Sequence, residues 1–197
     1  MKQTNEATQD TGVKITADIV LFFDLDGTLV DTNLANFLSY DKAIKSVIKS
    51  HRGLTYNPDK RFNRSNLKNA VPNLSEEEYK KIIQEKEVFY KDFLHETILK
   101  TEIAGILYKY SKTNKTILVT NCRKNRALTT LSHFGLADKF SRIFYREFGE
   151  NEKTNKFQNA ISKLGIPPNL VLAYENEEIE ITDAKQAGIE IINPKLI

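Results

Sequence analysis

Two aspartates stand two positions apart at the end of an apolar run. Residues 19–23 read IVLFF, and Asp24, Asp26, Gly27 and Thr28 follow within the next five positions. This pattern predicts a strand buried on both faces that ends in a small acidic turn. Buried carboxylates are costly unless a metal ion or a charged partner compensates them, so the pattern favours a reactive site at the strand's carboxyl end. The alternative is an ordinary turn, because aspartate and Asp-Gly pairs favour turns.

A hydroxyl and an amide follow a second predicted strand. Residues 116–119 read TILV, and Thr120 and Asn121 come next, before Cys122 and Arg123 at the expected start of a helix. Backbone N–H groups at a helix start, together with a hydroxyl and an amide, suit an anion such as phosphate. Threonine and asparagine are also common helix caps, which gives these two residues an ordinary structural interpretation as well.

Charged residues follow two further predicted strands. Lys153 and Lys156 precede a helix, where a lysine could neutralise phosphate and carboxylate charge. The strand over residues 170–174 ends in the acidic sequence ENEE, which begins at Glu175 and faces the same edge as Asp24. Oxygen ligands from these two strand ends would form a magnesium site that retains several waters. The alternatives are solvated loop lysines and a helix start at which glutamates are favoured by the helix dipole.

Alternating strands and helices must position these groups. The apolar patterns predict strands over residues 19–23, 116–119, 142–145, 170–174 and 189–192, with helices over residues 103–110, 127–134, 155–164 and 179–187. Short strands separated by helices favour a parallel sheet covered on both faces, which is an α/β fold with a Rossmann-like core.

The segment between the first two core strands has a helical pattern only. A helix is expected over residues 32–49, and a long helix is expected from a capping box of Ser75 and Glu78 to about Leu99. Between them, Arg61, Arg64 and Lys68 occur at spacings that could share one helical face. We therefore expect a small all-helical cap over residues 33–99, inserted after the first strand, which would exclude water and select the substrate. Residues 19–32 and 100–197 would form the catalytic core, and residues 1–18 a polar tail.

Composition limits the other classes of function. The 197 residues suffice for one domain with a sizeable core and a small insertion. A net charge of +3 gives little reason to expect nucleic acid or a membrane surface as a partner. The single cysteine, Cys122, excludes an intrachain disulfide, fits a reducing compartment and is interpreted as buried and inert. Without an apolar leader or membrane span, the chain is expected to be cytoplasmic.

In their order, these motifs resemble those of the haloacid dehalogenase-like superfamily. The sequence DLDGTLVDT, from Asp24 to Thr32, is similar to the first motif, and LVTN, ending at Asn121, to the second. A lysine at position 153 or 156 resembles the third, and YENEEIEITDAKQAGI, beginning at Tyr174, the fourth. The sequences FGLADKF and KFQNAISKLGI also resemble the phosphoglucomutase-like branch, so the likeness extends over about residues 19–194. It implies a Rossmann-like core with a helical cap.

The resemblance also implies a role for each motif. Asp24 would be the nucleophile that forms an aspartyl-phosphate intermediate, and Asp26 the acid/base. Thr120, Asn121 and either Lys153 or Lys156 would bind the phosphoryl group. Mg²⁺ would be held by the Asp24 carboxylate, the Asp26 backbone carbonyl, Glu175 and Asn176. The fourth motif departs from the usual pattern, since Asn176 stands where an aspartate is common and Glu180 where a glycine is common.

The function implied is that of a magnesium-dependent phosphatase acting on a small phosphorylated metabolite. Asp26 favours phosphoryl transfer over dehalogenation, because dehalogenases of this superfamily lack an acid/base at that position. A phosphosugar mutase would return the phosphoryl group to its substrate and is a close alternative. A binding or regulatory protein with weak or lost turnover is the alternative from another class, suggested by Asn176.

Overall fold

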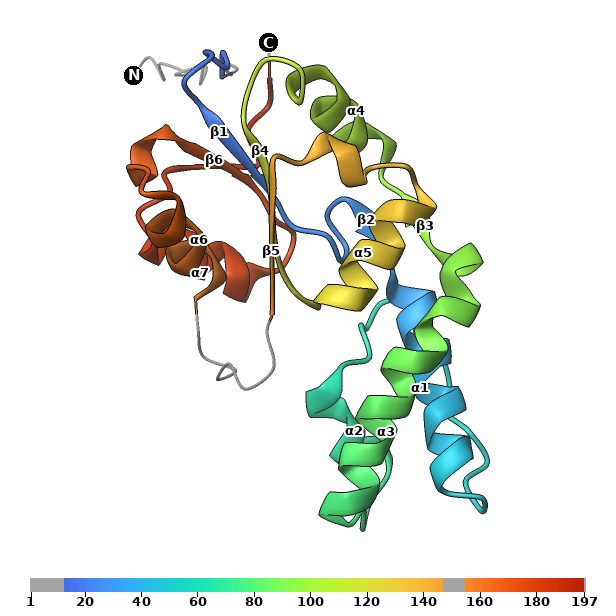
Figure 1. The fold of residues 1–197 in the computed structure, drawn as a ribbon. Coiled ribbons are helices and arrows are strands. Elements are labelled where there is room, and N and C mark those ends of the chain that lie inside the picture. The colour runs from blue at the N-terminus through green and yellow to red at the C-terminus, as the bar shows by residue number, and fades with distance from the viewer. Residues whose placement is uncertain (1–12, 147–154, 197) are drawn as a thin grey trace, which may run out of the picture.

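A computed structural model of the chain describes residues 13–146 and 155–196. Its main sheet has five parallel strands in the order β5-β4-β1-β6-β7, with β1 (Val20–Phe23) at the centre (Figure 1). The other strands are β4 (Thr116–Arg123), β5 (Arg142–Arg146), β6 (Val171–Tyr174) and β7 (Ile191–Ile192). This arrangement confirms the predicted α/β class with a Rossmann-like parallel sheet.

The alternation of side chains along β1 explains why both faces of the sheet are covered. Leu21 and Phe23 point into one core, which also receives α4 (Thr101–Tyr110) and α5 (Lys124–His133). Val20 and Phe22 point into the opposite core. That second core receives α6 (Lys156–Leu164) and α7 (Glu178–Gln186), so the two helix pairs lie on opposite sides of the sheet (Figure 1). All four residues of β1 are buried, as expected for a central parallel strand.

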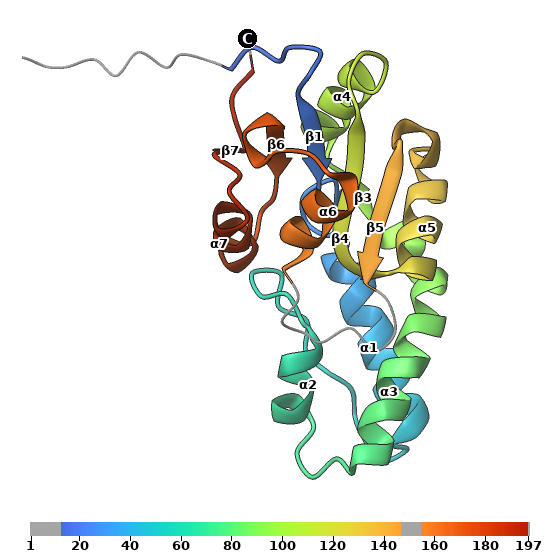
Figure 2. The same cartoon turned by 60° about the vertical axis from the view of Figure 1, so that its left-hand side comes forward.

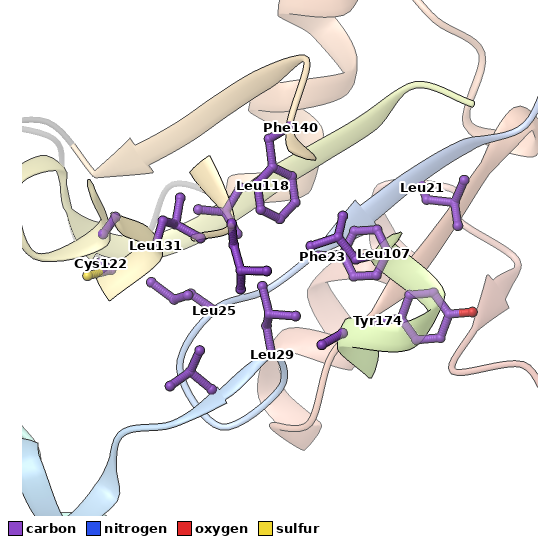
Figure 3. Close-up of a cluster of buried hydrophobic side chains, with 14 of the residues drawn as sticks. Leu21, Phe23, Leu25, Leu29, Leu107, Leu118, Cys122, Leu131, Phe140 and Tyr174 are labelled. Atoms are coloured by element: carbon purple, nitrogen blue, oxygen red, sulfur yellow. The ribbon is translucent and has the colours of Figure 1, made fainter. Parts of the chain in front are cut away.

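Aromatic packing fixes the site-bearing ends of two strands. Phe23 stacks on Tyr174 with ring centroids 5.1 Å apart, and Phe140 meets Phe23 edge-on at 6.0 Å (Figure 3). Phe23 and Tyr174 are the last residues of β1 and β6. Because they are also register partners, the residues that follow them leave the sheet side by side.

A helical module lies beyond the carboxyl ends of these strands (Figure 2). It contains α1 (Asn33–Val47), α2 (Arg64–Ala70) and α3 (Glu76–Phe89), followed by a 3₁₀ segment, η1 (Tyr90–Glu96). Its own core includes Ile44, Leu67 and Ile82. Two short 3₁₀ turns elsewhere, η2 (Ala137–Lys139) and η3 (Pro168–Leu170), precede β5 and β6. Within the described residues, no helix combines the length and the apolar character that a membrane crossing requires.

Two expectations for this module are corrected. The long helix does not reach Leu99, because α3 ends at Phe89 and the chain tightens into η1, where Phe93 leaves helical geometry. Arg61 does not share a helical face with Arg64, since it precedes Asn63, the N-cap of α2. The capping box at the start of α3 is present as predicted.

The two connections between module and sheet are paired with each other. β2 (Val30–Asp31) leaves the core and β3 (Ile98–Leu99) returns to it, and they form an antiparallel two-stranded sheet. The backbone N–H of Lys100 also donates to the carbonyl of Leu29 at 3.0 Å. Both connections are therefore tied together at one point.

Candidate active site

The acidic turn after β1 is buried although it is highly polar. Asp24 and Asp26 are 5% and 6% exposed, and the backbone N–H of Asp24 donates to the carbonyl of Tyr174 at 3.0 Å. Gly27 has a φ of +89°, and a Cβ there would come within 2.7 Å of the Asn176 side chain. A glycine is thus required both by the left-handed turn and by the close approach of the neighbouring strand's loop.

Lys156 lies at the centre of a group of carboxylates. It is the first residue of α6, whose N-cap Asn155 accepts hydrogen bonds from two backbone N–H groups of the first turn. Its Nζ lies 2.8 Å from Asp24 Oδ1 and 2.7 Å from Glu175 Oε2, and it also pairs with Glu180. Of the two lysines named from the sequence, Lys156 is therefore the one that the structure brings to this site, while Lys153 lies outside the described residues.

The carboxylates around Lys156 strongly affect one another. Burial raises the pKa of Asp24 to about 6, although the Lys156 charge opposes this shift. Burial, with the charge of Asp24, raises the pKa of Glu175 to about 8. Burial acts against protonation of Lys156, but the Asp24, Glu180 and Glu175 charges outweigh it and raise the lysine pKa. Three acids thus share one fixed cation, which leaves negative charge uncompensated.

The same three acids could hold a divalent metal ion. One oxygen from each of Asp24, Glu175 and Glu180 lies within 4.8 Å of the other two. Glu180 Oε2 pairs with the same Lys156 Nζ that Asp24 and Glu175 contact, so the three acids converge on one point. Carboxylate oxygens are the ligands that Mg²⁺ prefers, and a second positive charge would offset the excess of acid. The residues present therefore fit the expected ion.

Two of the metal ligands expected from the sequence are engaged elsewhere. Asn176 Oδ1 accepts a hydrogen bond from the Thr28 hydroxyl at 2.8 Å, and the side chain packs on Gly27. The backbone carbonyl of Asp26 accepts from Arg61 Nη1 at 3.1 Å. Glu180 belongs to the acidic group around Asp24, whereas Asn176 does not. In the sequence, Glu180 is notable only because it replaces a glycine.

Asp26 is enclosed by cations and a hydroxyl. Its Oδ2 lies 2.8 Å from Arg126 Nη2 and 3.1 Å from Arg61 Nη2, and its Oδ1 accepts from the Thr32 hydroxyl at 2.8 Å. Burial would raise the pKa of Asp26, but the Arg126 and Arg61 charges and the Thr32 hydrogen bond outweigh burial and hold that pKa below its usual range. In this state the two aspartates differ, because Asp24 is the weaker acid and Asp26 the stronger one.

Thr120 and Asn121 border the same cavity as the two aspartates, a space of about 210 Å³. Thr120 is buried, and its hydroxyl accepts from the backbone N–H of Cys122 at 3.1 Å. Asn121 Nδ2 donates to Glu180 Oε1 at 3.0 Å. The helix expected at Cys122 and Arg123 begins at Lys124 with Arg123 as its N-cap, and β4 continues up to that point.

The helical module contributes Lys86 to this cavity. Lys86 is 3% exposed, lies 3.3 Å from Glu87 Oε1 and sits 5.2 Å from the Tyr40 ring centroid and 5.6 Å from that of Tyr90. Burial, then the charge of Arg126, lowers the Lys86 pKa to about 8. Lys86 thus brings a buried cation from α3 to the cavity that the strand ends border.

Sequence reasoning missed Arg126, Lys86 and Glu180. Their partners are distant in the chain, and Arg126 stands 100 positions from Asp26. One signal was available, since Lys86 falls among the apolar positions of α3, next to Ile82 and Ile83 in the buried stripe. Lys68, which the sequence did suggest, pairs instead with Glu76 on the surface.

Known proteins resemble this chain in sequence and in fold. A family model described as "Haloacid dehalogenase-like hydrolase" matches residues 21–193. A "Phosphorylated carbohydrates phosphatase" of Thermotoga maritima is 24% identical over 184 residues, which cover 87% of this chain and 82% of that protein.

Two solved structures illustrate the shared fold. A haloacid dehalogenase-like hydrolase from Streptococcus pneumoniae superposes with a TM-score of 0.72 at 18% identity, over 90% of this chain and 84% of that one. A predicted phosphoglycolate phosphatase from Haemophilus somnus superposes with a TM-score of 0.71 at 23% identity, over 89% and 84%. The family match spans most of the sequence and includes both strand ends that form the site. The chain therefore belongs to the haloacid dehalogenase-like hydrolase family.

Proposed function

We propose that the protein is a magnesium-dependent phosphatase that hydrolyses a small phosphorylated metabolite through an intermediate on Asp24. The observation that supports this most is the buried contact between Asp24 and Lys156 at 2.8 Å, with Asp26 two residues away in a different electrostatic setting. Two carboxylates whose pKa values are pushed apart suit a nucleophile and a separate proton carrier.

In the first step, a carboxylate oxygen of Asp24 attacks phosphorus and the bond between phosphorus and the leaving oxygen breaks. Asp26 gives its proton to that leaving oxygen. In the second step, Asp26 takes a proton from water, the water oxygen attacks phosphorus, and the bond to Asp24 breaks to release inorganic phosphate. Arg126 holds Asp26 in the ionised form that the second step uses.

Arg61 offers a way to reach the protonated form that the first step requires. It comes from the helical module and contacts both Asp26 at 3.1 Å and Glu177 at 2.8 Å. If Arg61 turned to the phosphate of an entering substrate, Asp26 would lose one of its two cations and its pKa would rise. We treat residues 33–99 as the cap that delivers this arginine.

Asp24, Glu175 and Glu180 would hold the metal ion. When bound, Mg²⁺ supplies positive charge that offsets the repulsion between the attacking carboxylate and the phosphoryl oxygens. Lys156 neutralises the remaining carboxylate charge, and Thr120 with Asn121, in the last half of β4, binds the phosphoryl oxygens. The buried thiol of Cys122 takes no part, and it is consistent with a reducing, cytoplasmic setting.

The substrate class rests on the relative from Thermotoga maritima, whose name states that it acts on phosphorylated carbohydrates. We infer a small phosphorylated compound of this kind. Cationic side chains of the module, Arg61, Arg64 and Lys86, line the reaction cavity and suit such an anion.

The test is phosphate release from a generic aryl phosphate and from a panel of sugar phosphates, with Mg²⁺ and with a chelator. Asp24→Asn should abolish release, whereas Asp18→Asn, the same change at an exposed site, should leave it intact. Phosphate release that survives in Asp24→Asn refutes the mechanism. Isomerised sugar phosphate without free phosphate would indicate a mutase. A panel that yields no product with Mg²⁺, Mn²⁺ or Co²⁺ would indicate a binding protein.

A further inference from the structure

The side chain of Arg126 crosses from the core into the helical module. It belongs to the first turn of α5, which meets η1 of the module (Figure 2). Its Nη2 lies 2.8 Å from Asp26 Oδ2 in the core. The module supplies Asn36, whose Oδ1 lies 3.5 Å from Nη1, and the Tyr90 ring, whose centroid lies 5.3 Å from Cζ. Module side chains therefore help to set how this arginine meets Asp26.

One donor of this guanidinium has an acid near it but no hydrogen bond. Within the described ranges, the buried Nε–H of Arg126 has no acceptor. Glu87 Oε2 lies 3.9 Å from Nε, which is an ionic contact but too long for a hydrogen bond. Because N–H···O bonds form at about 2.9 Å, a movement of about 1 Å would complete this one. A buried donor without an acceptor is unfavourable, so that movement would be favoured.

Glu87 is a carboxylate that already faces two cations. It stands on α3, its side chain is 20% exposed, and its Oε1 lies 3.3 Å from Lys86 Nζ. Burial would raise the pKa of Glu87, but the Lys86 and Arg126 charges outweigh burial and lower that pKa. Arg126 thus links two carboxylates, one from the module and one from the acidic turn.

The place of Glu87 in the reaction cavity needs a reason, because a carboxylate there opposes the charge of a phosphorylated substrate. Glu87 is not one of the three acids that converge on Lys156 and could hold a metal ion. Its contact with Arg126 supplies a reason, since that arginine is the closest cation to Asp26.

We propose that Glu87 is a positioning residue for phosphoryl transfer: it anchors the Arg126 guanidinium, which in turn orients the Asp26 carboxyl toward the leaving oxygen. The inference rests on the proposed function, in which Asp26 gives a proton to that oxygen. Glu87 acts through Arg126 and not on the substrate. Loss of its charge should therefore impair most the step that depends on protonation of the leaving group.

The test compares two substrates that differ in their need for the acid. An alkyl phosphate releases a strongly basic alkoxide and depends on proton donation, whereas nitrophenyl phosphate releases a stable phenolate. With Mg²⁺ present, kcat/KM is measured, because it reports the step in which the leaving oxygen departs and not the later attack by water. A positioned acid contributes about 10²–10⁴-fold, so a misdirected one in Glu87→Gln should lower kcat/KM for the alkyl phosphate about tenfold. For nitrophenyl phosphate, kcat/KM should stay within about twofold of wild type.

Matched variants separate this role from a structural one. Glu85→Gln is the control, because Glu85 is also half-buried on α3 but does not border the reaction cavity, and it should keep both values within about twofold of wild type. Glu87→Asp keeps the charge and should lose less than Glu87→Gln on the alkyl phosphate. Both Glu87 variants should spare nitrophenyl phosphate, so either one suffices if the other does not fold.

Three results overturn the proposal: equal losses on the two substrates, equal losses in Glu87→Gln and Glu87→Asp, or no loss in either. A fall in KM for Glu87→Gln with unchanged kcat also overturns it, since Glu87 would then only repel the substrate. Failure of the phosphatase proposal would appear separately, as absence of phosphate release from both substrates by the unaltered protein.

Discussion

Replacing Lys86 by methionine should stabilise the protein at neutral pH. Lys86 is 3% exposed, and the groups that face it are Glu87, Arg126, Asp26 and the Tyr40 and Tyr90 rings. Methionine has a similar length, fills the same space between the two rings and needs no charged partner. The change removes the burial cost of an ammonium group and leaves the packing of α3 in place.

The magnitude follows from the pKa of Lys86. Burial and Arg126 lower that pKa from its ordinary 10.5 to about 8. One pKa unit corresponds to about 1.4 kcal/mol, so the charged lysine costs the folded state about 3 kcal/mol below pH 8. Between about pH 8 and 10.5 the unfolded chain binds more protons at this residue than the folded chain does, so wild-type stability gains a contribution that rises with pH.

The assay is urea unfolding of Lys86→Met and wild type at a series of pH values. The variant should be more stable by about 2–3 kcal/mol near pH 7, and the difference should shrink toward zero as the pH approaches 10.5. Lys81→Met, on the exposed side of α3, should change stability by no more than about 0.5 kcal/mol. A variant less stable than wild type near pH 7, or a difference independent of pH, would refute the reasoning. Phosphatase activity should fall, since the cavity loses a cation.

Three further outcomes are expected. Glu180→Gln should weaken Mn²⁺ binding about tenfold in calorimetry, because it removes one of three converging carboxylates. The control Glu178→Gln should bind Mn²⁺ within about twofold of wild type. Equal losses of affinity in both variants would argue against Glu180 as a ligand. Arg61→Gln should lower kcat/KM about tenfold through loss of its contacts with the acidic turn, whereas exposed Arg52→Gln should not. Cys122 is 1% exposed, and burial raises its thiol pKa to about 12. A disulfide reagent should therefore label Cys122 only after unfolding. Rapid labelling of the native protein would contradict the burial of this residue.

Local pattern was sufficient for the architecture of the core. The continuous apolar run before Asp24, and the later strands separated by helices, predict a parallel sheet because only strands covered on both faces are apolar throughout. The helical spacing of apolar residues after Ser75 predicted the wrong end for α3. The 3₁₀ turns of η1 repeat every three residues, close enough to the α-helical period that the apolar stripe through Leu94 continues while the backbone tightens.

The site was predictable where it depends on strand ends and unpredictable where it depends on long-range pairing. Asp24 and Glu175 directly follow parallel strands, and Thr120 lies in the last half of β4, so topology alone brings the three to one edge of the sheet. The arginine of α5 that pairs with Asp26 stands 100 positions away in the sequence, so the pairing itself leaves no local signal. The sequence identifies Glu180 only as a residue that replaces a glycine. Its approach to Asp24 depends on how α7 packs on the sheet, which the sequence does not show.

The pairing of β2 with β3 has a consequence for how the protein can vary. Because Val30 faces Leu99 and Asp31 faces Ile98, the segment between them begins and ends at neighbouring points. Closing this loop costs almost the same chain entropy whether the intervening segment is short or long, since that cost rises only with the logarithm of length. The core can therefore accept an insert of a different length between β2 and β3 without re-forming its sheet, provided that the insert still delivers a cation to Asp26, as Arg61 does here.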